Sequence, residues 1–255
     1  MTTTHPTPLI RARGLAKSFG EGAARTDVLH DIDLDVDEGE FLAIMGPSGS
    51  GKSTLLYCLS GLDAVDSGTV HVAGTEITAL DQDRLAALRL RTMGFVFQQV
   101  HLLRNLTLLD NVVLPGFTAT PRDRVGVVER ARALLQRVGI AELADRDITA
   151  ASGGQLQRAA IARALVNRPA LVLGDEPTGA LNAITAAGIM DLLAEVNAEG
   201  RTVVVVTHDP RVAARARRVI VLRDGRIDGD LQRDTTEGDD GWRSRLDVWL
   251  LGAGV

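Results

Sequence analysis

The chain has 255 residues and a formal net charge of −5, and 45% of its residues are hydrophobic. This length suits one large α/β domain or two small ones. The acidic balance, with 3% aromatic residues, argues against a nucleic-acid-binding protein, because such proteins are usually basic. Cys58 is the only cysteine, so a disulfide framework is excluded and a reducing, cytoplasmic compartment is expected. No apolar run approaches the length of a membrane span, and the polar residues 1–8 lack the apolar core of a signal peptide.

Two patterns in the sequence predict β-strands of different kinds. In residues 28–36, Ile32, Leu34 and Val36 alternate with aspartates, as expected of a strand with one face in solvent. Residues 202–206 are β-branched throughout, which is typical of a parallel strand buried on both faces. Further strands are predicted at residues 9–19, 41–45, 69–73, 94–97, 171–173 and, last in the chain, 219–222.

The predicted helices are identified by their capping residues. Thr107 is a candidate N-cap for a helix at 108–114, and Ser152 for a helix that runs to Asn167. Pro121 in the first turn and Gly139 at the end delimit a third helix. Other helices are predicted at residues 55–59, 81–91, 182–199 and 209–217.

The order of these elements predicts the domain organisation. Helices over about 99–168 interrupt an α/β pattern, so we expect a helical subdomain inserted in a single domain of residues 1–230. The early strands predict an N-terminal antiparallel β subdomain. Residues 231–255 are expected to form an acidic linker and a short helix, with Trp242, Leu246, Trp249 and Leu250 at helical spacing as a packing surface.

The stretch from Gly46 to Thr54 fits the phosphate-binding pattern G-x-x-x-x-G-K-[ST], between a predicted strand and a predicted helix. Its glycines let successive backbone N–H groups point inward at a polyphosphate, and the helix N-terminus adds positive charge. Lys52 is expected to reach the β- and γ-phosphates, and Ser53 to bind Mg²⁺. The fold class is therefore a P-loop nucleotide hydrolase with a RecA-like α/β core. The expected phosphate-binding residues are Gly46, Pro47, Ser48, Gly49, Ser50, Gly51, Lys52, Ser53 and Thr54.

Two further stretches carry groups that suit nucleotide hydrolysis. The apolar strand at 171–173 leads into Asp175, which could hold Mg²⁺, and Glu176, which could orient or deprotonate a water molecule. An ordinary acidic turn is the alternative. Ser152, followed by two glycines and Gln155, opens a second helix N-terminus suited to an anion. A single nucleotide needs only one anion-binding helix N-terminus. The second one therefore suggests that it contacts a nucleotide held by another copy of the chain.

In these stretches the chain resembles the ATP-binding cassette (ABC) ATPases, over about residues 9–229. It is similar to the nucleotide-binding subunits that pair with MacB- or FtsX-type permeases, the lipoprotein-release and macrolide-export group. The residues from Gly46 to Thr54 match the Walker A motif, 171–176 the Walker B motif and 151–155 the signature motif. Pro177 to Asn182 matches the D-loop.

The resemblance implies ATP and Mg²⁺ as ligands and a role for each matching residue. Glu176 would polarise the attacking water, and His208 would bridge the γ-phosphate and the catalytic region. Gln98 would sense the γ-phosphate and Mg²⁺, which makes Ser53, Gln98 and Asp175 the implied metal ligands. Phe19 would stack on adenine. The signature residues implied to hold the nucleotide of a second copy are Ser152, Gly153, Gly154 and Gln155.

Two positions depart from the family pattern. Ala151 stands where the signature usually begins with Leu, so the seating of the signature helix is expected to be looser. Asn182 replaces the usual Asp of the D-loop, and it keeps hydrogen-bonding capacity without the charge. The second change puts communication between the two ATP sites in doubt.

The resemblance also implies partners. Two copies would close head to tail around ATP, and separate permease subunits would dock near Gln99 to Leu114, where Val100, Leu102, Leu103 and Leu106 are apolar in a segment expected at the surface. The chain would then work at the cytoplasmic face of the membrane, exporting or extracting a hydrophobic cargo. The alternative is an ATP-driven switch of the division-associated FtsE type, which moves no substrate.

Overall fold

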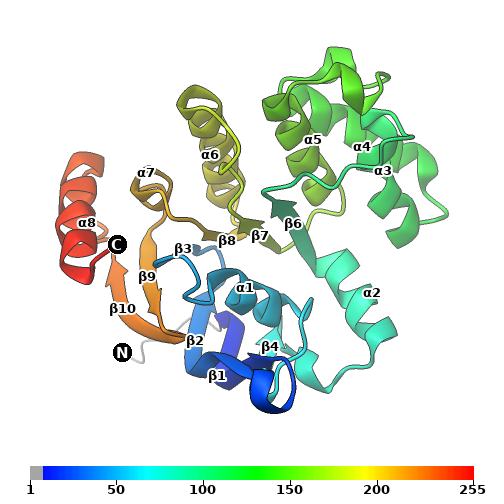
Figure 1. Cartoon of the computed structure of the whole chain (residues 1–255). Helices are drawn as coiled ribbons and strands as arrows, with labels where there is room; N and C mark the ends of the chain where they lie inside the picture. Colours follow the sequence, from blue (N-terminus) through cyan, green and yellow to red (C-terminus); the bar gives the residue numbers. More distant parts are fainter. Residues whose placement is uncertain (1–7) are drawn as a thin grey trace, which may run out of the picture.

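A four-stranded and a six-stranded sheet form the scaffold of the computed structural model, which describes residues 8–255 (Figure 1). The polar N-terminus predicted to lack a signal peptide lies, except for Pro8, outside the described residues. The strands are β1 (Pro8–Phe19), β2 (Thr26–Asp37), β3 (Phe41–Met45), β4 (Ser67–Val72), β5 (Thr75–Glu76), β6 (Met93–Phe97), β7 (Leu171–Asp175), β8 (Thr202–Val206), β9 (Arg218–Arg223) and β10 (Arg226–Gln232). The α-helices are α1 (Lys52–Ser60), α2 (Gln82–Thr92), α3 (Leu108–Ala119), α4 (Arg124–Arg137), α5 (Gly153–Leu165), α6 (Ala183–Ala198), α7 (Pro210–Ala213) and α8 (Asp239–Ala253).

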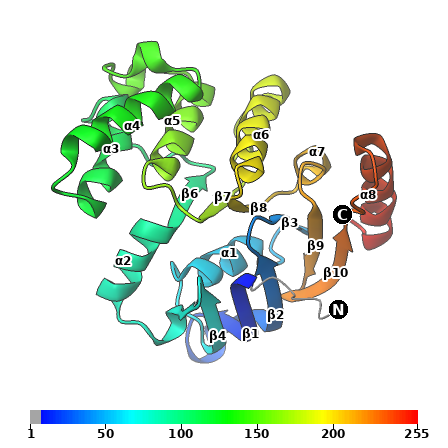
Figure 2. The same cartoon turned by 180° about the vertical axis from the view of Figure 1, so that it is seen from behind.

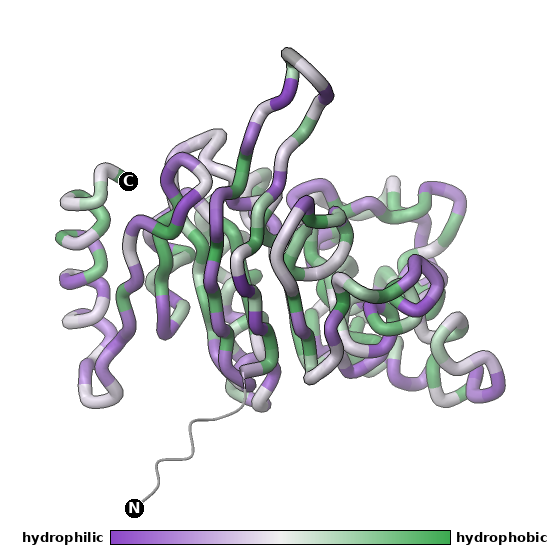
Figure 3. Tube along the Cα trace, turned by 90° about the horizontal axis from the view of Figure 1, so that it is seen from below, coloured by the Kyte–Doolittle hydropathy of each residue, from purple (hydrophilic) through white to green (hydrophobic). Residues whose placement is uncertain are grey.

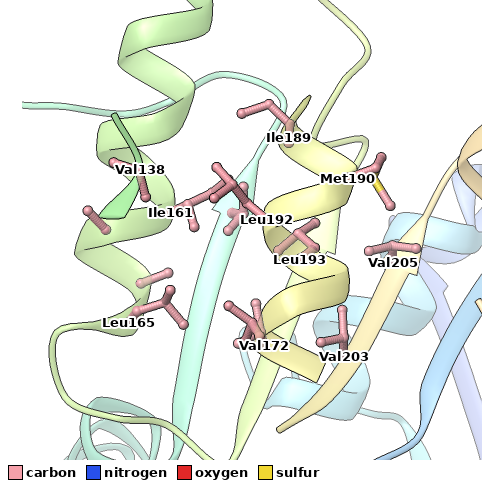
Figure 4. Packing of buried hydrophobic residues seen from close by; sticks show 14 of the residues in the cluster. Val138, Ile161, Leu165, Val172, Ile189, Met190, Leu192, Leu193, Val203 and Val205 are labelled. Atoms are coloured by element: carbon pink, nitrogen blue, oxygen red, sulfur yellow. The ribbon is translucent and has the colours of Figure 1, made fainter. Parts of the chain in front are cut away.

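The larger sheet has the strand order β10-β9-β3-β8-β7-β6, and all its pairs are parallel except β10 with β9. Every residue of β3 and β8 is buried, as the β-branched run at 202–206 predicts. Alternate residues of these strands face two different cores, one on each side of the sheet. Figure 4 shows the first core, where Met190 and Leu193 of α6 pack over Val203 and Val205 of β8.

The smaller sheet, β2-β1-β4-β5, is antiparallel, as predicted for the early part of the chain. Ile32, Leu34 and Val36 of β2 are buried, whereas the aspartates between them are exposed or half-buried. This face packs with α1 and with Leu42 and Ile44 of β3 to form the second core. The long β1–β2 hairpin extends past the neighbouring strands (Figure 3).

Between β6 and β7 the chain forms α3, α4 and α5, which stand to one side of the sheet (Figures 1 and 2). Thr107 and Ser152 are N-caps, as predicted, and each forms a capping box with the residue three positions later. Gly139, with φ of 73°, follows the end of α4 as expected. We propose that this block is the subdomain predicted at 99–168, inserted in one domain of residues 1–230.

Three predicted boundaries are wrong. Pro121 lies before α4, because the side chain of Asp123 caps that helix by accepting a hydrogen bond from the backbone N–H of Gly126 at 3.1 Å. The helix predicted at 209–217 is only the four-residue α7, since the N–H of Arg217 already bonds the carbonyl of Phe41 at 2.9 Å as the chain joins the sheet. The strand predicted as the last is followed by β10, which pairs with β9 across a turn at Asp224 and Gly225.

The C-terminal helix is a packing element, as predicted. Trp242, Leu246 and Leu250 of α8 are at most 1% exposed and join the first core. The aromatic ring of Trp249 lies over Gly229 of β10, where a Cβ atom would meet the ring at 2.7 Å. The stretch at 234–241, expected to be a flexible linker, contains the beginning of α8 at Asp239.

None of the helices in residues 8–255 is long and apolar enough to cross a bilayer. This agrees with the sequence analysis, which finds no apolar run of that length.

Burial predicts that Cys58 is unreactive in the folded chain. The Cys58 side chain is 1% exposed, and burial raises the pKa of its thiol to about 12, so almost no reactive thiolate forms at pH 8. A thiol reagent such as 5,5′-dithiobis(2-nitrobenzoate) should therefore label the native protein slowly and the urea-unfolded protein at once. Rapid labelling without denaturant would contradict this packing of α1.

Candidate functional site

The phosphate-binding loop lies between β3 and α1, as its sequence predicts, and two glycines fix its path. Gly46 has φ of 145°, and a Cβ atom there would lie 2.0 Å from the carbonyl oxygen of Leu222. Gly51 has φ of 97° and is the N-cap residue of α1. A side chain at position 46 would thus force the loop away from β9, and position 51 needs a left-handed conformation that L-residues rarely adopt.

Lys52 lies against the inside of this loop. Its ammonium donates hydrogen bonds to the carbonyl oxygens of Gly46 at 2.9 Å and Pro47 at 2.7 Å. Burial lowers the pKa of Lys52, and the nearby carboxylates of Glu176 and Asp175 oppose that shift. The lysine is therefore placed where phosphate oxygens could replace the two carbonyl oxygens.

Ser53 connects the loop with the end of β7. Its hydroxyl donates a hydrogen bond to Asp175 at 2.7 Å, and the hydroxyl of Tyr57 donates to the other oxygen of the same carboxylate. Burial, followed by the hydrogen bond to Asp175, raises the pKa of Tyr57, which keeps the phenol protonated as a donor. Sequence reasoning missed Tyr57, although it follows Ser53 by four residues and so shares its helix face.

Glu176 and His208 meet at the same edge of the sheet. The Nδ1 atom of His208 lies 2.9 Å and 2.7 Å from the two carboxylate oxygens of Glu176. The backbone N–H of Glu176 bonds the carbonyl of Val206 at 3.0 Å, and its φ of 47° turns the side chain out of the strand path. This strained conformation aims the carboxylate at the strand end of β8, where His208 begins the next loop.

Gln98 directly follows β6 and lies near Glu176 and Gly179. A Cβ atom on Gly179 would lie 2.9 Å from the Nε2 atom of Gln98 and 3.1 Å from a carboxylate oxygen of Glu176. The D-loop glycine therefore leaves room for both polar side chains. The predicted groups Lys52, Ser53, Asp175, Glu176, His208 and Gln98 thus lie at the carboxyl ends of β3, β7, β8 and β6.

The signature residues lie at the start of α5, where they form a capping box, and not at the sheet edge with the other predicted groups. The hydroxyl of Ser152 accepts a hydrogen bond from the N–H of Gln155, and the side chain of Gln155 accepts one from the N–H of Ser152 at 2.8 Å. Ser152 and Gly153 are exposed. Within residues 8–255, no hydrogen bond connects these signature residues with the phosphate-binding loop. The structure therefore does not bring the two predicted nucleotide-binding segments together in one chain.

Two side chains of α5, not singled out in the sequence, attach this helix to the segment around Gln98. The side-chain amide of Gln157, which is 2% exposed, donates to the carbonyl of Phe97 at 3.0 Å. Arg163 donates to the carbonyls of Val100 at 2.9 Å and His101 at 2.7 Å. Any displacement of the Gln98 segment must then be shared with the helix that begins at the signature.

The two departures from the family pattern have a structural role. Ala151 is partly buried and packs against the first core, although it is smaller than Leu. Asn182 is the N-cap of α6, and its side chain accepts a hydrogen bond from the N–H of Thr185 at 3.0 Å. Asn and Asp serve equally as N-caps, so the helix start is kept without the charge.

Phe19, the predicted adenine platform, ends β1 at the tip of the long hairpin. Its side chain is 45% exposed, and the ammonium of Lys17 lies 4.9 Å from the ring centroid. One face of an exposed ring is what stacking on a base requires. The adenine-stacking role remains a prediction.

A phosphate-binding loop at the end of a parallel strand, beside a second strand that ends in two carboxylates, defines a P-loop nucleotide hydrolase. Residues 29–179 match the family described as ABC transporter. The chain is 49% identical to the lipoprotein-releasing system ATP-binding protein LolD 2 of Rhodospirillum rubrum, over 87% of this chain and 96% of that protein. It is 48% identical to the macrolide export ATP-binding/permease protein MacB of Paracoccus denitrificans, over 92% of this chain, and it spans 35% of that longer protein.

Solved structures agree. A dimeric ATP-binding cassette in a post-hydrolysis state, bound to ADP and Pi, has a TM-score of 0.80 and 38% identity, over 88% of this chain and 99% of that one. The chain belongs to the ABC transporter family.

Substituting Gly46 should disrupt nucleotide binding more than substituting Gly49. In Gly46→Ala the added Cβ meets backbone at 2.0 Å, whereas at Gly49, with φ of 81°, nothing lies within 4 Å. We expect the Kd for ATP, measured by calorimetry, to rise on the order of tenfold or more in Gly46→Ala. Gly49→Ala carries only the strain of a left-handed residue, about 1–2 kcal/mol. Equal effects of the two changes would contradict the close approach of Gly46 to β9.

Proposed function

We propose that this chain is the ATP-hydrolysing subunit that drives a separate MacB- or FtsX-type permease. The observation that carries this is the pairing of Glu176 with His208 next to the Ser53–Asp175 hydrogen bond. These four groups suit ATP hydrolysis, and the relatives are a macrolide export protein and a lipoprotein-releasing system protein. The cargo would be a hydrophobic molecule that the permease handles, and this chain would work at the cytoplasmic face of the membrane.

In the proposed reaction each polar group has a separate task. Lys52 and the backbone N–H groups of 46–52 bind the β- and γ-phosphates, at the positive end of α1. Glu176 orients and polarises the attacking water, and His208 holds the Glu176 carboxylate in place through Nδ1. A serine hydroxyl, a carboxylate and phosphate oxygens are suitable donors for Mg²⁺, so Ser53 and Asp175, with Gln98 nearby, would hold it. Bound Mg²⁺ would neutralise charge on the phosphates.

The second nucleotide-binding segment requires a second copy of the chain in this proposal. Gly153 and Gly154 begin α5, a helix of 13 residues, and the Ser152 N–H is already bonded to the side chain of Gln155. Because Ser152 and Gly153 are exposed and no hydrogen bond within residues 8–255 connects them with their own P-loop, the Ser152 hydroxyl and the glycine N–H groups would contact ATP bound by the partner copy. The dimeric cassette found among the solved structures supports this arrangement.

The permease would dock at an apolar groove between the sheet edge and the helical block. Phe95 and Phe97 of the edge strand β6 stack with ring centroids 5.8 Å apart. The groove is lined by Ala86, Arg89, Leu90, Met93, Gly94, Phe95, Phe97, His101, Pro115, Arg163, Ala164 and Asn167. His101 is the one residue of the predicted docking segment, Gln99 to Leu114, among those that line this groove. A permease segment with apolar side chains would cover the phenylalanines.

One residue of the predicted docking surface is not at the surface. Leu102 is 8% exposed and packs in the first core, whereas Leu103 is 47% exposed. The side chain of Asn111 fixes this part of the loop, because it accepts from the N–H of Leu103 at 2.7 Å and donates to the Leu103 carbonyl at 3.1 Å. The loop therefore holds Leu103 at the surface, and Leu102 anchors the same loop by packing in the first core.

Replacing Glu176 by Gln should separate ATP binding from hydrolysis. The amide keeps the size of the side chain but is a poor base, so we expect the rate of phosphate release to fall by roughly 10²- to 10⁴-fold. ATP binding should persist, and the variant should accumulate as a dimer in light scattering after size-exclusion chromatography with ATP. A Glu176→Gln chain that hydrolyses ATP at the wild-type rate would contradict the proposed role.

Leu103→Asp should weaken copurification of the permease without loss of ATP binding or thermal stability, because a charge is added at an exposed position. Leu102→Asp is the comparison, since it buries a charge and should lower the free energy of unfolding by about 3 kcal/mol. If Leu103→Asp still copurified with the permease in full yield, the docking assignment would be wrong.

A further inference from the structure

The loop that carries His208 continues into a helix too short to hold its own position. Asp209 caps α7, which has four residues, Pro210 to Ala213. Forming one helical turn is unfavourable in isolation, because several backbone dihedrals are fixed for a single hydrogen bond. The elements packed against α7 must therefore fix its position. They also fix the direction from which His208 approaches Glu176.

The C-terminal helix and strand β3 both contact α7. α7 lies between α6 and α8 in both Figures 1 and 2. Trp242 of α8 is fully buried, and its indole N–H donates a hydrogen bond to the carbonyl oxygen of Ala214, the C-cap residue of α7, at 3.1 Å. Val212 and Ala213 are buried in the same core as Leu246 and Leu250 of α8. The last carbonyl group of α7 is thus bonded from α8, and the buried face of α7 packs into the first core, to which β3 and α8 both contribute.

The side of α7 toward α6 is held more loosely. A cleft separates α6 from α7 and α8, lined by Ala186, Ala187 and Met190 on one wall and by Val212, Ala214 and Arg243 on the other. The ion pair between Arg215 and Asp191, at 2.8 Å, crosses this side, and its side chains are 34% and 52% exposed. Exposed ion pairs contribute at most about 1 kcal/mol. Of the two neighbouring helices, α8 is the one that holds α7 by a hydrogen bond from a buried side chain.

We infer that α8 positions His208, and that it acts through the hydrogen bond from Trp242 to Ala214. The α8 helix fixes the end of α7, α7 fixes Asp209, and the Asp209 segment places His208 against Glu176. Trp242 is a positioning residue, because it touches neither nucleotide nor the reacting atoms. This inference rests on the proposed catalytic role of the Glu176–His208 pair.

The test is Trp242→Phe, which keeps an aromatic ring in the core, removes the N–H donor and also removes one of the two rings of the indole. Trp249→Phe on the same helix is the matched control, since Trp249 packs on Gly229 of β10 and, within residues 8–255, its side chain makes no hydrogen bond to α7. We expect kcat for ATP hydrolysis to fall roughly three- to tenfold in Trp242→Phe, with the KM for ATP within about twofold of wild type. Trp249→Phe should leave both constants unchanged.

A cycle with His208→Ala separates positioning from general destabilisation. If Trp242 acts through His208, adding Trp242→Phe to His208→Ala should lower kcat no further. An undiminished effect in the His208→Ala background, or equal effects of the two tryptophan changes, would overturn the inference. Failure of the proposed function would look different, because the wild-type chain itself would then hydrolyse no ATP.

A second substitution covers the case in which Trp242→Phe is unstable. Benzothienylalanine at position 242 keeps the two-ring shape and replaces the N–H by sulfur, so it removes the donor without leaving a cavity. Amide hydrogen exchange at Val212 to Arg215 should accelerate in this variant while exchange in β8 stays slow. Unchanged exchange together with wild-type kcat would overturn the inference.

Discussion

The hydrogen bond from Ser53 to Asp175 connects two segments that are 122 residues apart in the chain, and the rest of the site depends on it. It can form only because β3 and β7 are parallel and separated by a single strand, β8. The same order puts the end of β8, and therefore His208, between the phosphate-binding loop and Glu176. The buried valines of β8 fix this arrangement, because each fully buried side chain contributes roughly 1.5–3 kcal/mol.

The site assembled in this way is incomplete within one chain. The P-loop side carries Lys52, Ser53 and the carboxylates of Asp175 and Glu176, whereas the signature serine caps a helix that belongs to the helical block. Gln157 and Arg163 connect that helix to the end of β6 and the segment after it, which contributes His101 to the apolar groove. Side-chain hydrogen bonds from α5 thus connect the signature helix with the groove and with the segment that carries Gln98. In the proposed function, these hydrogen bonds connect permease docking to closure over ATP.

Much of the site could be predicted from sequence because its determinants are local. The glycines of the G-x-x-x-x-G-K-[ST] pattern, the lysine within it and the carboxylates at the end of an apolar strand are all read directly from neighbouring residues. Tyr57 was missed because its role depends on Asp175, far away in sequence, and helical spacing from Ser53 was the one available signal. Leu102 and Leu103 look alike in sequence, and only the path of the loop separates the buried one from the exposed one.

The errors in the fold have similar causes. The strand β10 is half exposed along its length, so it lacks an apolar run, although Asp224 and Gly225 are a strong hairpin signal. The apolar residues after Asp209 favour a helix over 209–217, but the backbone beyond α7 pairs with β3 instead, and a sheet partner cannot be read from periodicity. The C-terminal helix is predicted as a packing surface. Its contact with Ala214, at the end of α7, could not be predicted from the sequence, because it depends on how α7 and α8 lie in three dimensions.

The central claim is that each ATP site is built from the P-loop of one copy and the signature of another. It is tested by two chains that both carry Glu176→Gln, one with Lys52→Ala and the other with Ser152→Arg. Neither chain alone can form an intact site, but a mixed dimer would contain one intact P-loop facing one intact signature. Light scattering with ATP should therefore detect dimers in the mixture and monomers in each separate sample. A mixture that stays monomeric, or a Ser152→Arg chain that dimerises alone as well as the Glu176→Gln parent, would contradict the account.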